Sequence, residues 1–389
     1  MTLLQPTMVA ALLVSGLGVA LLGSVKVPLA RRLAIGEARV GGLVSLFGFA
    51  MIPVILAAGF LTDLLGRHLV FRGGCGLLAV SLVALAQARA YPLALAAVVL
   101  LSGGWSLLVN VGNVLTPLAF PGGMAYATNL ANVFFGLGAF LTPLAVAFLV
   151  RRTSLPWALT LLGGLALAPA LLSLGVDFAA LTPGANPDPA AASGPAQGVG
   201  SLLGDPVLWL CGLALFFYGP LEASMGAWAT TYLGERGVPE ATASGLLSGF
   251  WLAFMLSRLA AAFGLPAGRE TTLILVLALA CVAVMLGVVL SRRPATAMAQ
   301  VVAAGAIFGP IFPTLMAVLL AHFAPAVHGR AVGLLFAIGG VGWTLIPVLI
   351  GTYARRAGVQ RGFAIAVAAA VGLSLIALLL AMRGGLGSG

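Results

Sequence analysis

The sequence predicts an all-α membrane protein in which twelve transmembrane helices form two pseudo-symmetric bundles of six. Hydrophobic residues make up 61% of the 389 residues and charged residues only 7%. The mean hydropathy is +1.16, and a composition this apolar is not that of a soluble domain. Apolar runs recur along almost the whole chain, and one polar stretch near the middle separates six runs from six.

The individual spans follow from the thickness of the bilayer. A hydrocarbon core of ~30 Å requires about 20 helical residues. Arginines, prolines and glycine-rich breaks delimit the apolar runs. The predicted spans of the first half are residues 8–33, 38–61, 69–88, 91–118, 124–150 and 156–175. Those of the second half are residues 205–234, 240–263, 269–290, 295–321, 327–353 and 360–382.

The central polar stretch, residues 177–204, is rich in Ala, Pro, Gly and Ser and lacks apolar periodicity. Such a stretch predicts a flexible linker. The predicted domains are therefore residues 1–176, this linker and residues 205–389. Six spans on each side are typical of transporters whose halves are related by an axis along the membrane normal.

Charge and cysteine content argue against several functions. The net charge of +10 is spread over short loops as single or paired arginines, which argues against a nucleic-acid partner. The three cysteines are isolated in apolar runs, so we expect no disulfide framework, metal site or cofactor. No Walker loop, dinucleotide fingerprint or nucleophile elbow occurs in the sequence, and we expect neither an enzyme nor ATP-driven transport by this chain alone.

Lys26, the only lysine of the chain, lies well inside the first predicted span. A lone ammonium at the bilayer centre costs roughly 2.5–3.5 kcal/mol. We therefore expect Lys26 to face a polar interior, where it binds an anionic or polyhydroxyl solute or exchanges a proton. A lysine that snorkels to the outer surface is the alternative interpretation.

Glu222 is the only carboxylate that falls well inside a predicted span. A Lys26–Glu222 pair, broken or re-formed by substrate or proton, is the sharpest hypothesis for a coupling site. A permanent structural ion pair, or a hydrogen-bonded cap where the helix breaks at Pro220, is the alternative.

Other polar and aromatic side chains are candidates for a solute site. Asn110 and Asn113 lie three apart on one face of the fourth span, close to Trp105. Amides beside an aromatic plane suit a sugar ring or a carboxylate. The same spacing recurs in the fifth span, and two aromatic residues lie near Glu222; these further candidates are Asn129, Asn132, Tyr218 and Trp228. Interhelical hydrogen bonding and packing are the alternative roles.

The sequence G-F-L-T-D-L-L-G-R-H at residues 59–68 resembles the signature G-x-L-x-D-x-x-G-R-[RK] of the major facilitator superfamily. In that family the signature loop joins helices two and three on the cytoplasmic side and helps gate the inner face. The resemblance implies a gating role for Gly59, Asp63, Gly66 and Arg67. Arg258 in the eighth span is a further gating candidate, through a salt bridge, and a side chain that merely snorkels is the alternative interpretation.

A finer resemblance is to the fucose and glucose/galactose permease branch of this superfamily. It rests on four stretches: residues 110–113 with 129–136, residues 218–233, residues 309–314 and the glycine cluster at 339–347. Where that branch has an acidic residue in helix one, this chain has Lys26. Where it has a glutamate in helix four, this chain has Val109 or Asn110. In the family those carboxylates bind sugar and carry the proton, so fucose–proton symport does not transfer unchanged.

Residues and resemblance together predict a secondary active transporter that moves a small polar solute, a sugar or sugar-like molecule, by alternating access. Coupling to a proton or sodium gradient is expected, with facilitated transport as an alternative. An organic-anion transporter that uses Lys26 as counter-charge is the second hypothesis, followed by a lipid or amphiphile exporter and a non-transporting receptor. We expect a monomer in the lipid bilayer.

The expected location is the cell inner membrane, with multiple passes and cytoplasmic termini, because the signature loop is cytoplasmic in the family. The loop arginines oppose this orientation under the positive-inside rule. The predicted outer ends carry Arg31, Arg32, Arg39, Arg89, Arg151, Arg152, Arg236, Arg292, Arg293, Arg355, Arg356 and Arg361. The predicted inner loops carry Arg67, Arg72, Arg269, Arg330 and Arg383.

Overall fold

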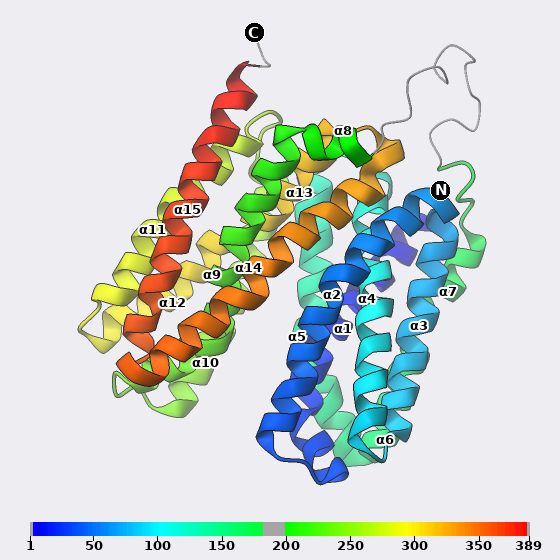
Figure 1. Cartoon of the computed structure of the whole chain (residues 1–389), viewed down its shortest axis with the longest axis horizontal. Coiled ribbons are helices and arrows are strands. Elements are labelled where there is room, and N and C mark those ends of the chain that lie inside the picture. The colour runs from blue at the N-terminus through cyan, green and yellow to red at the C-terminus, as the bar shows by residue number, and fades with distance from the viewer. Residues whose placement is uncertain (1–2, 182–198, 387–389) are drawn as a thin grey trace. The chain divides into compact units, whose positions relative to one another are not determined.

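The structure is a computed structural model that describes residues 3–181 and 199–386, which form helices joined by short loops, without any strand in those ranges. The helices of the first half (Figure 1) are α1 (Leu4–Leu33), α2 (Glu37–Leu65), α3 (Arg67–Gln87), α4 (Tyr91–Ala119), α5 (Met124–Arg152), α6 (Leu155–Ala166) and α7 (Ala168–Leu172). Those of the second half are α8 (Val199–Gly204), α9 (Pro206–Gly234), α10 (Glu240–Gly264), α11 (Glu270–Leu290), α12 (Pro294–Phe308), α13 (Ile311–His322), α14 (His328–Ala357) and α15 (Val359–Leu386).

Twelve stretches of the described residues are long and apolar enough to cross a membrane, which confirms the predicted number of spans. Two of the spans are broken helices. The sixth runs through α6, α7 and a 3-10 turn at Ser173–Gly175, and the tenth joins α12 to α13. Proline explains both breaks, because Pro169 and Pro310 have no amide hydrogen for the carbonyl four residues earlier.

The chain divides into two compact units. Unit 1 contains residues 1–121, 134–202 and 323–333, and unit 2 contains residues 122–133, 203–322 and 334–389. The helices α5 and α14 therefore each contribute residues to both units. The division into domains at residues 177–204 stays a prediction.

Part of the predicted linker is helical. Residues 182–198 lie outside the described residues, but Val199–Gly204 form α8 instead of flexible coil. Leu202 is buried, and the Trp209 indole donates a hydrogen bond of 2.7 Å to the Leu203 carbonyl. These contacts hold the end of α8 to the first turn of α9, so the prediction of a flexible linker fails for these six residues.

The two halves repeat one close helix crossing. A Cβ at Gly138 of α5 would lie 2.7 Å from the Cα of Leu13 in α1, and a Cβ at Gly342 of α14 would lie 2.9 Å from the Cα of Phe216 in α9. Only glycine permits backbones to approach this closely. The fifth span thus packs on the first within unit 1 as the eleventh packs on the seventh within unit 2, which is the predicted pseudo-symmetry.

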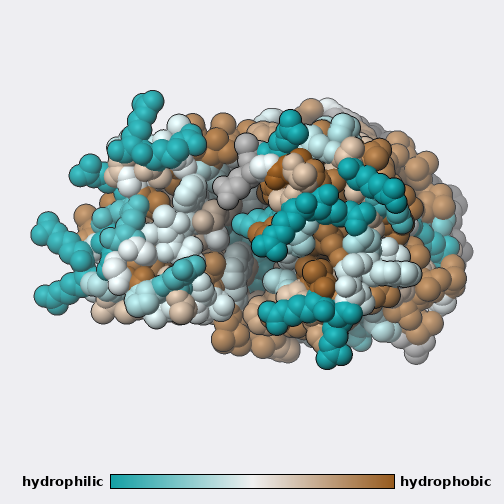
Figure 2. Space-filling model, turned by 90° about the horizontal axis from the view of Figure 1, so that it is seen from below, coloured by the Kyte–Doolittle hydropathy of each residue, from teal (hydrophilic) through white to brown (hydrophobic). Residues whose placement is uncertain are grey.

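Arginines gather at one set of helix ends in each unit. In unit 1 these ends include those at Leu33, Gln87 and Arg152, and in unit 2 those at Leu290 and Ala357. Figure 2 shows long hydrophilic side chains at helix ends of the chain, seen from below the view of Figure 1. The clustering within each unit agrees with the predicted loop charges, while the side of the membrane on which these helix ends lie stays a prediction.

Candidate functional site

Asp63, near the end of α2, caps the first turn of α14. Its Oδ1 accepts from the Gly329 amide at 3.0 Å, and its Oδ2 accepts from the Arg330 amide at 3.0 Å and from Arg330 Nε at 2.9 Å. The Asp63 side chain is only 7% exposed. Helix amides and a guanidinium both stabilise a carboxylate at this position. We call Asp63, Gly329 and Arg330 the α2–α14 cluster.

Arg330 was missed as a partner by reasoning from the sequence, which counted it only as a loop charge. A signal was present, because α14 begins at His328 and Arg330 therefore lies in its first turn. A cation there opposes the helix dipole and calls for an anion nearby. The identity of that anion could not be read from the sequence.

The other signature residues lie at or near the end of α2. A Cβ at Gly59 would lie 3.2 Å from the Cα of Arg330, so a larger residue would push α14 away from α2. Gly66 ends α2 with φ at +87°, a backbone conformation that favours glycine. Arg67 donates to the Pro325 carbonyl at 3.1 Å and to the Leu181 carbonyl at 3.3 Å.

Asn110 extends the α2–α14 cluster to α4. Its Oδ1 accepts from Thr62 Oγ1 at 2.9 Å, and its Nδ2 donates to the Gly329 carbonyl at 3.0 Å. The residue is fully buried. Each of the two polar atoms of the amide therefore has a protein partner in a fully buried position, which favours a role in joining helices.

Unit 2 contains a second cluster, built around Glu222 near the middle of α9. The Tyr218 hydroxyl lies 2.8 Å from Glu222 Oε2 and 3.0 Å from the Phe308 carbonyl at the end of α12. The two side chains are one helical turn apart, which lets them meet on one face of α9. Tyr218 is fully buried, whereas Glu222 remains partly exposed.

The Tyr218 hydroxyl has one proton but two neighbouring acceptors. If Glu222 is ionised, this proton can satisfy either the carboxylate or the Phe308 carbonyl, but not both. If Glu222 is protonated, its own O–H can donate to Tyr218, and Tyr218 can donate to Phe308. The protonated form thus satisfies both contacts, and the position of the hydroxyl proton depends on the charge of Glu222.

Arg258 of α10 joins this region through backbone groups. Its Nε donates to the Gly309 carbonyl at 2.8 Å, and its Nη1 donates to the Asn132 carbonyl at 3.2 Å. Its guanidinium carbon lies 4.2 Å from the centre of the Phe254 ring. The predicted salt bridge is not formed with any described carboxylate. The break after α12 instead leaves carbonyls that a guanidinium can satisfy.

The side chains of the two asparagines of α5 donate hydrogen bonds to other groups of the protein. Asn129 is fully buried, and its Nδ2 donates to the Ala125 carbonyl at 3.0 Å and to Thr314 Oγ1 at 3.3 Å. Its Oδ1 is buried without a hydrogen-bond partner among the described residues. The Nδ2 of Asn132 donates to the Thr128 carbonyl at 2.9 Å. Of the pair, only Asn129 has a fully buried side-chain atom without a hydrogen-bond partner among the described residues.

The remaining solute candidates differ in their surroundings. Lys26 is exposed on α1 and makes no hydrogen bond or ion pair within the described part of unit 1. Asn113 is half-buried and donates to the Val109 carbonyl of its own helix at 2.8 Å.

Trp105 is buried, with its indole donating to the Ser15 carbonyl at 2.9 Å, which fixes α4 to α1. A Cβ at Gly351 of α14 would lie 2.7 Å from the half-buried Trp228 ring.

The described residues contain no group of three or more His, Cys, Asp or Glu side chains that could hold a metal ion. The two clusters offer hydrogen-bond donors and acceptors, and each contains one carboxylate, Asp63 or Glu222.

Twelve candidate spans in two repeat-related sets, together with a signature Asp63 that caps α14, are features of a transporter-type membrane protein. A family model of the Major Facilitator Superfamily matches residues 8–291. The chain belongs to the major facilitator superfamily and is a membrane transporter of that family.

One relative by sequence is "Bypass of stop codon protein 6" of Saccharomyces cerevisiae, which is 28% identical over 170 residues. The match covers 41% of this chain and 34% of the length of that relative. This chain therefore aligns with only about a third of the yeast protein.

Solved structures share the fold over nearly the full length. The E. coli fucose:proton symporter FucP has a TM-score of 0.77 at 17% identity, covering 96% of this chain and 98% of FucP. The proton:xylose symporter XylE has a TM-score of 0.81 at 13% identity, covering 96% and 94%. The human organic anion transporter MFSD10 has a TM-score of 0.72 at 20% identity, covering 97% and 98%. Identities this low show a common fold alone.

Proposed function

We propose that the protein is a secondary active transporter that moves a sugar or sugar-like solute by alternating access, driven by a proton that binds Glu222. It would work as a monomer in the cell inner membrane, with cytoplasmic termini. Its fold is shared by two sugar:proton symporters, FucP and XylE. Their printed substrates make fucose and xylose the first solutes to test.

The arrangement of Tyr218 between Glu222 and the Phe308 carbonyl carries this proposal. Proton binding to Glu222 redirects the Tyr218 hydroxyl from the carboxylate to Phe308, at distances of 2.8 and 3.0 Å. Phe308 ends α12 directly before the break at Gly309 and Pro310. The charge of one carboxylate is thereby linked to a helix break, which is a place where a span can bend.

The α2–α14 cluster would serve as the gate of the transport cycle. It joins α2 and α4, from the first half of the chain, to the start of α14, from the second half. Alternating access requires the two halves to rock about a central site. In our proposal these hydrogen bonds form in one state and break in the other.

Uptake by proteoliposomes tests the function directly. Purified protein is reconstituted, and labelled L-fucose and D-xylose are supplied with and without an imposed inward proton gradient. We expect accumulation of one of them above the outside concentration only with the gradient. Absence of both uptake and counterflow for every sugar in a wider panel would contradict the proposal. Extrusion of a labelled amphiphile would favour the exporter alternative.

An organic anion is the second candidate solute, because Lys26 is exposed without a partner in the described part of unit 1. For this candidate, we expect Lys26→Ala to reduce uptake of labelled D-glucuronate by at least tenfold, since about 1.4 kcal/mol of lost attraction is already a factor of ten. Lys26→Arg, which keeps the charge, should retain part of the uptake. Unchanged glucuronate uptake by Lys26→Ala would exclude Lys26 as counter-charge.

Asn110 and Asn113 provide a matched pair that separates gating from solute binding. We expect Asn110→Ala to lower the melting temperature without ligand by several degrees, because two hydrogen bonds of about 1 kcal/mol each are lost in a buried site. Its sugar affinity, measured by thermal shift, should stay within about twofold. Asn113→Ala should leave the melting temperature unchanged, because Asn113 bonds only its own helix. If Asn110→Ala lost all sugar binding while its melting temperature stayed unchanged, Asn110 would be a solute-binding residue.

A further inference from the structure

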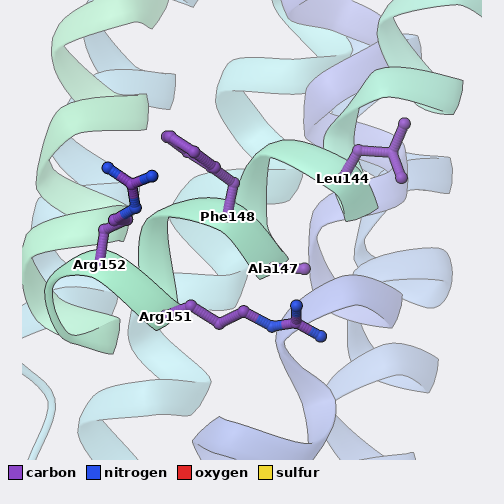
Figure 3. A pocket seen from close by; sticks show the side chains of 5 residues that line it. All are labelled: Leu144, Ala147, Phe148, Arg151 and Arg152. Carbon is purple, nitrogen blue, oxygen red and sulfur yellow. The ribbon is translucent and has the colours of Figure 1, made fainter.

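One face near the end of α5 combines exposed apolar side chains with two arginines. Leu144, Ala147, Phe148, Arg151 and Arg152 line a hollow of about 460 Å³, and Figure 3 shows these side chains on consecutive turns of α5. Leu144 is 59% exposed and Phe148 is 57% exposed. Arg152 lies over the Phe148 ring, with its guanidinium carbon 5.0 Å from the ring centre.

The two arginines are the last residues of the fifth span, so they lie where the hydrocarbon region gives way to headgroups. Neither guanidinium donates a hydrogen bond to any described residue. Arg32, at the end of α1, differs because it donates to the Ala86 and Ala88 carbonyls at 2.9 and 3.3 Å. The guanidinium N–H groups of Arg151 and Arg152 are thus available to a group outside the described residues.

The pseudo-symmetry supplies an internal comparison. The fifth span has Pro143 eight residues before its arginine pair, and the eleventh span has Pro347 eight residues before Arg355 and Arg356. Cations favour a helix C-terminus in either case, so the dipole alone does not distinguish the pairs. On α14 the positions that match Ala147 and Phe148 are Gly351 and Thr352. Gly351 packs against Trp228, and Arg355 contacts the Thr352 hydroxyl at 3.5 Å.

We propose that this face of α5 binds an anionic phospholipid. Its phosphate would be held by Arg151 and Arg152, because guanidinium groups bind phosphate through paired hydrogen bonds. An acyl chain would lie along Leu144 and Phe148, whose exposed apolar surface runs from the arginines toward the bilayer core. The combination of charge and apolar surface favours a lipid over a soluble anion.

Native mass spectrometry of the full chain tests the site. The protein is titrated with dioleoyl phosphatidylglycerol and, separately, with dioleoyl phosphatidylcholine. We expect the wild type to bind phosphatidylglycerol with an affinity at least tenfold higher than its affinity for phosphatidylcholine. The double variant Arg151→Gln/Arg152→Gln should lose this preference, and Phe148→Ala should weaken the adduct while retaining the preference for the anionic lipid.

The matched control is Arg355→Gln/Arg356→Gln, which removes the same charge from the equivalent end of α14. It should retain the adduct, and equal loss in both double variants would show a general charge effect and overturn the proposal. Excess inorganic phosphate should not displace the lipid, because phosphate lacks the acyl contacts. Complete displacement by inorganic phosphate would show an anion site without lipid specificity and would also overturn it.

Discussion

Glu222→Gln is expected to abolish accumulation of sugar against a gradient while solute exchange continues at close to the wild-type rate. Glutamine has nearly the same shape and can donate to the Tyr218 hydroxyl, which lies 2.8 Å from Glu222 Oε2. It resembles the protonated carboxyl but cannot release a proton. The internal sugar concentration should therefore reach, and not exceed, the external one.

Proteoliposomes provide both measurements. Accumulation is followed under an imposed inward proton gradient, and exchange is followed by counterflow of labelled sugar without one. The control is Glu240→Gln, which neutralises an exposed glutamate in the first turn of α10 and should behave as wild type. Equal loss of exchange and accumulation by Glu222→Gln would indicate a structural role for Glu222, and full accumulation would remove it from coupling.

Asp63→Asn is expected to release the first turn of α14. The variant removes the anion from a partly buried pair with Arg330 at 2.9 Å, and it weakens the acceptors of two backbone amides. Loss of one partner of a fully buried ion pair typically costs about 3–5 kcal/mol, so about 3 kcal/mol is the upper bound for this partly buried pair. A cost near 3 kcal/mol corresponds to roughly 100-fold faster opening of the amide hydrogen bonds.

Hydrogen–deuterium exchange of the peptide that contains Gly329 and Arg330 measures this opening. We expect faster exchange at these two amides in Asp63→Asn, together with a loss of net uptake, because the gate no longer holds one state of the cycle. Asp177→Asn is the control, since Asp177 accepts only from the amides of its own loop, at 3.0 and 3.2 Å. Unchanged exchange at Gly329 and Arg330 in Asp63→Asn would contradict the gating role of the cluster.

The fold could be predicted from the sequence because hydropathy is a local property. Every span must bury its own backbone hydrogen bonds in lipid, so an apolar run of sufficient length specifies a helix with little regard to the remaining chain. The predicted number of spans was correct for this reason. The prediction of a flexible linker failed for α8, because its polar and small residues suggested coil, whereas Trp209 of the next helix holds its end by a hydrogen bond.

The candidate site was only partly predictable. Glu222 stood out because a carboxylate is costly in a span, and that cost is visible in the sequence. Its partner Tyr218 was already a candidate, since the two lie one turn apart on α9. The role of the Phe308 carbonyl was not visible, because backbone groups carry no sequence signal and this carbonyl is 90 residues from Tyr218.

Asn110 also shows that the sequence does not specify the hydrogen-bond partner of a polar side chain inside a span. An amide inside a span signals a hydrogen-bond partner, but a solute and a neighbouring helix satisfy it equally well. The structure provides Thr62 and Gly329 as partners, 48 and 219 residues away in the chain.

The amino-acid sequence by itself therefore determined the class of protein, the twelve spans, the signature loop and the unusual charges inside the membrane. The spans and the unusual charges follow from the cost of placing particular side chains in hydrocarbon, whereas the signature loop was identified by its resemblance to a family motif. Only the tertiary structure decided which groups meet. Asp63 and Arg330 are 267 residues apart, and nothing local to either residue specifies the other, since pairing across that distance depends on how the helices pack.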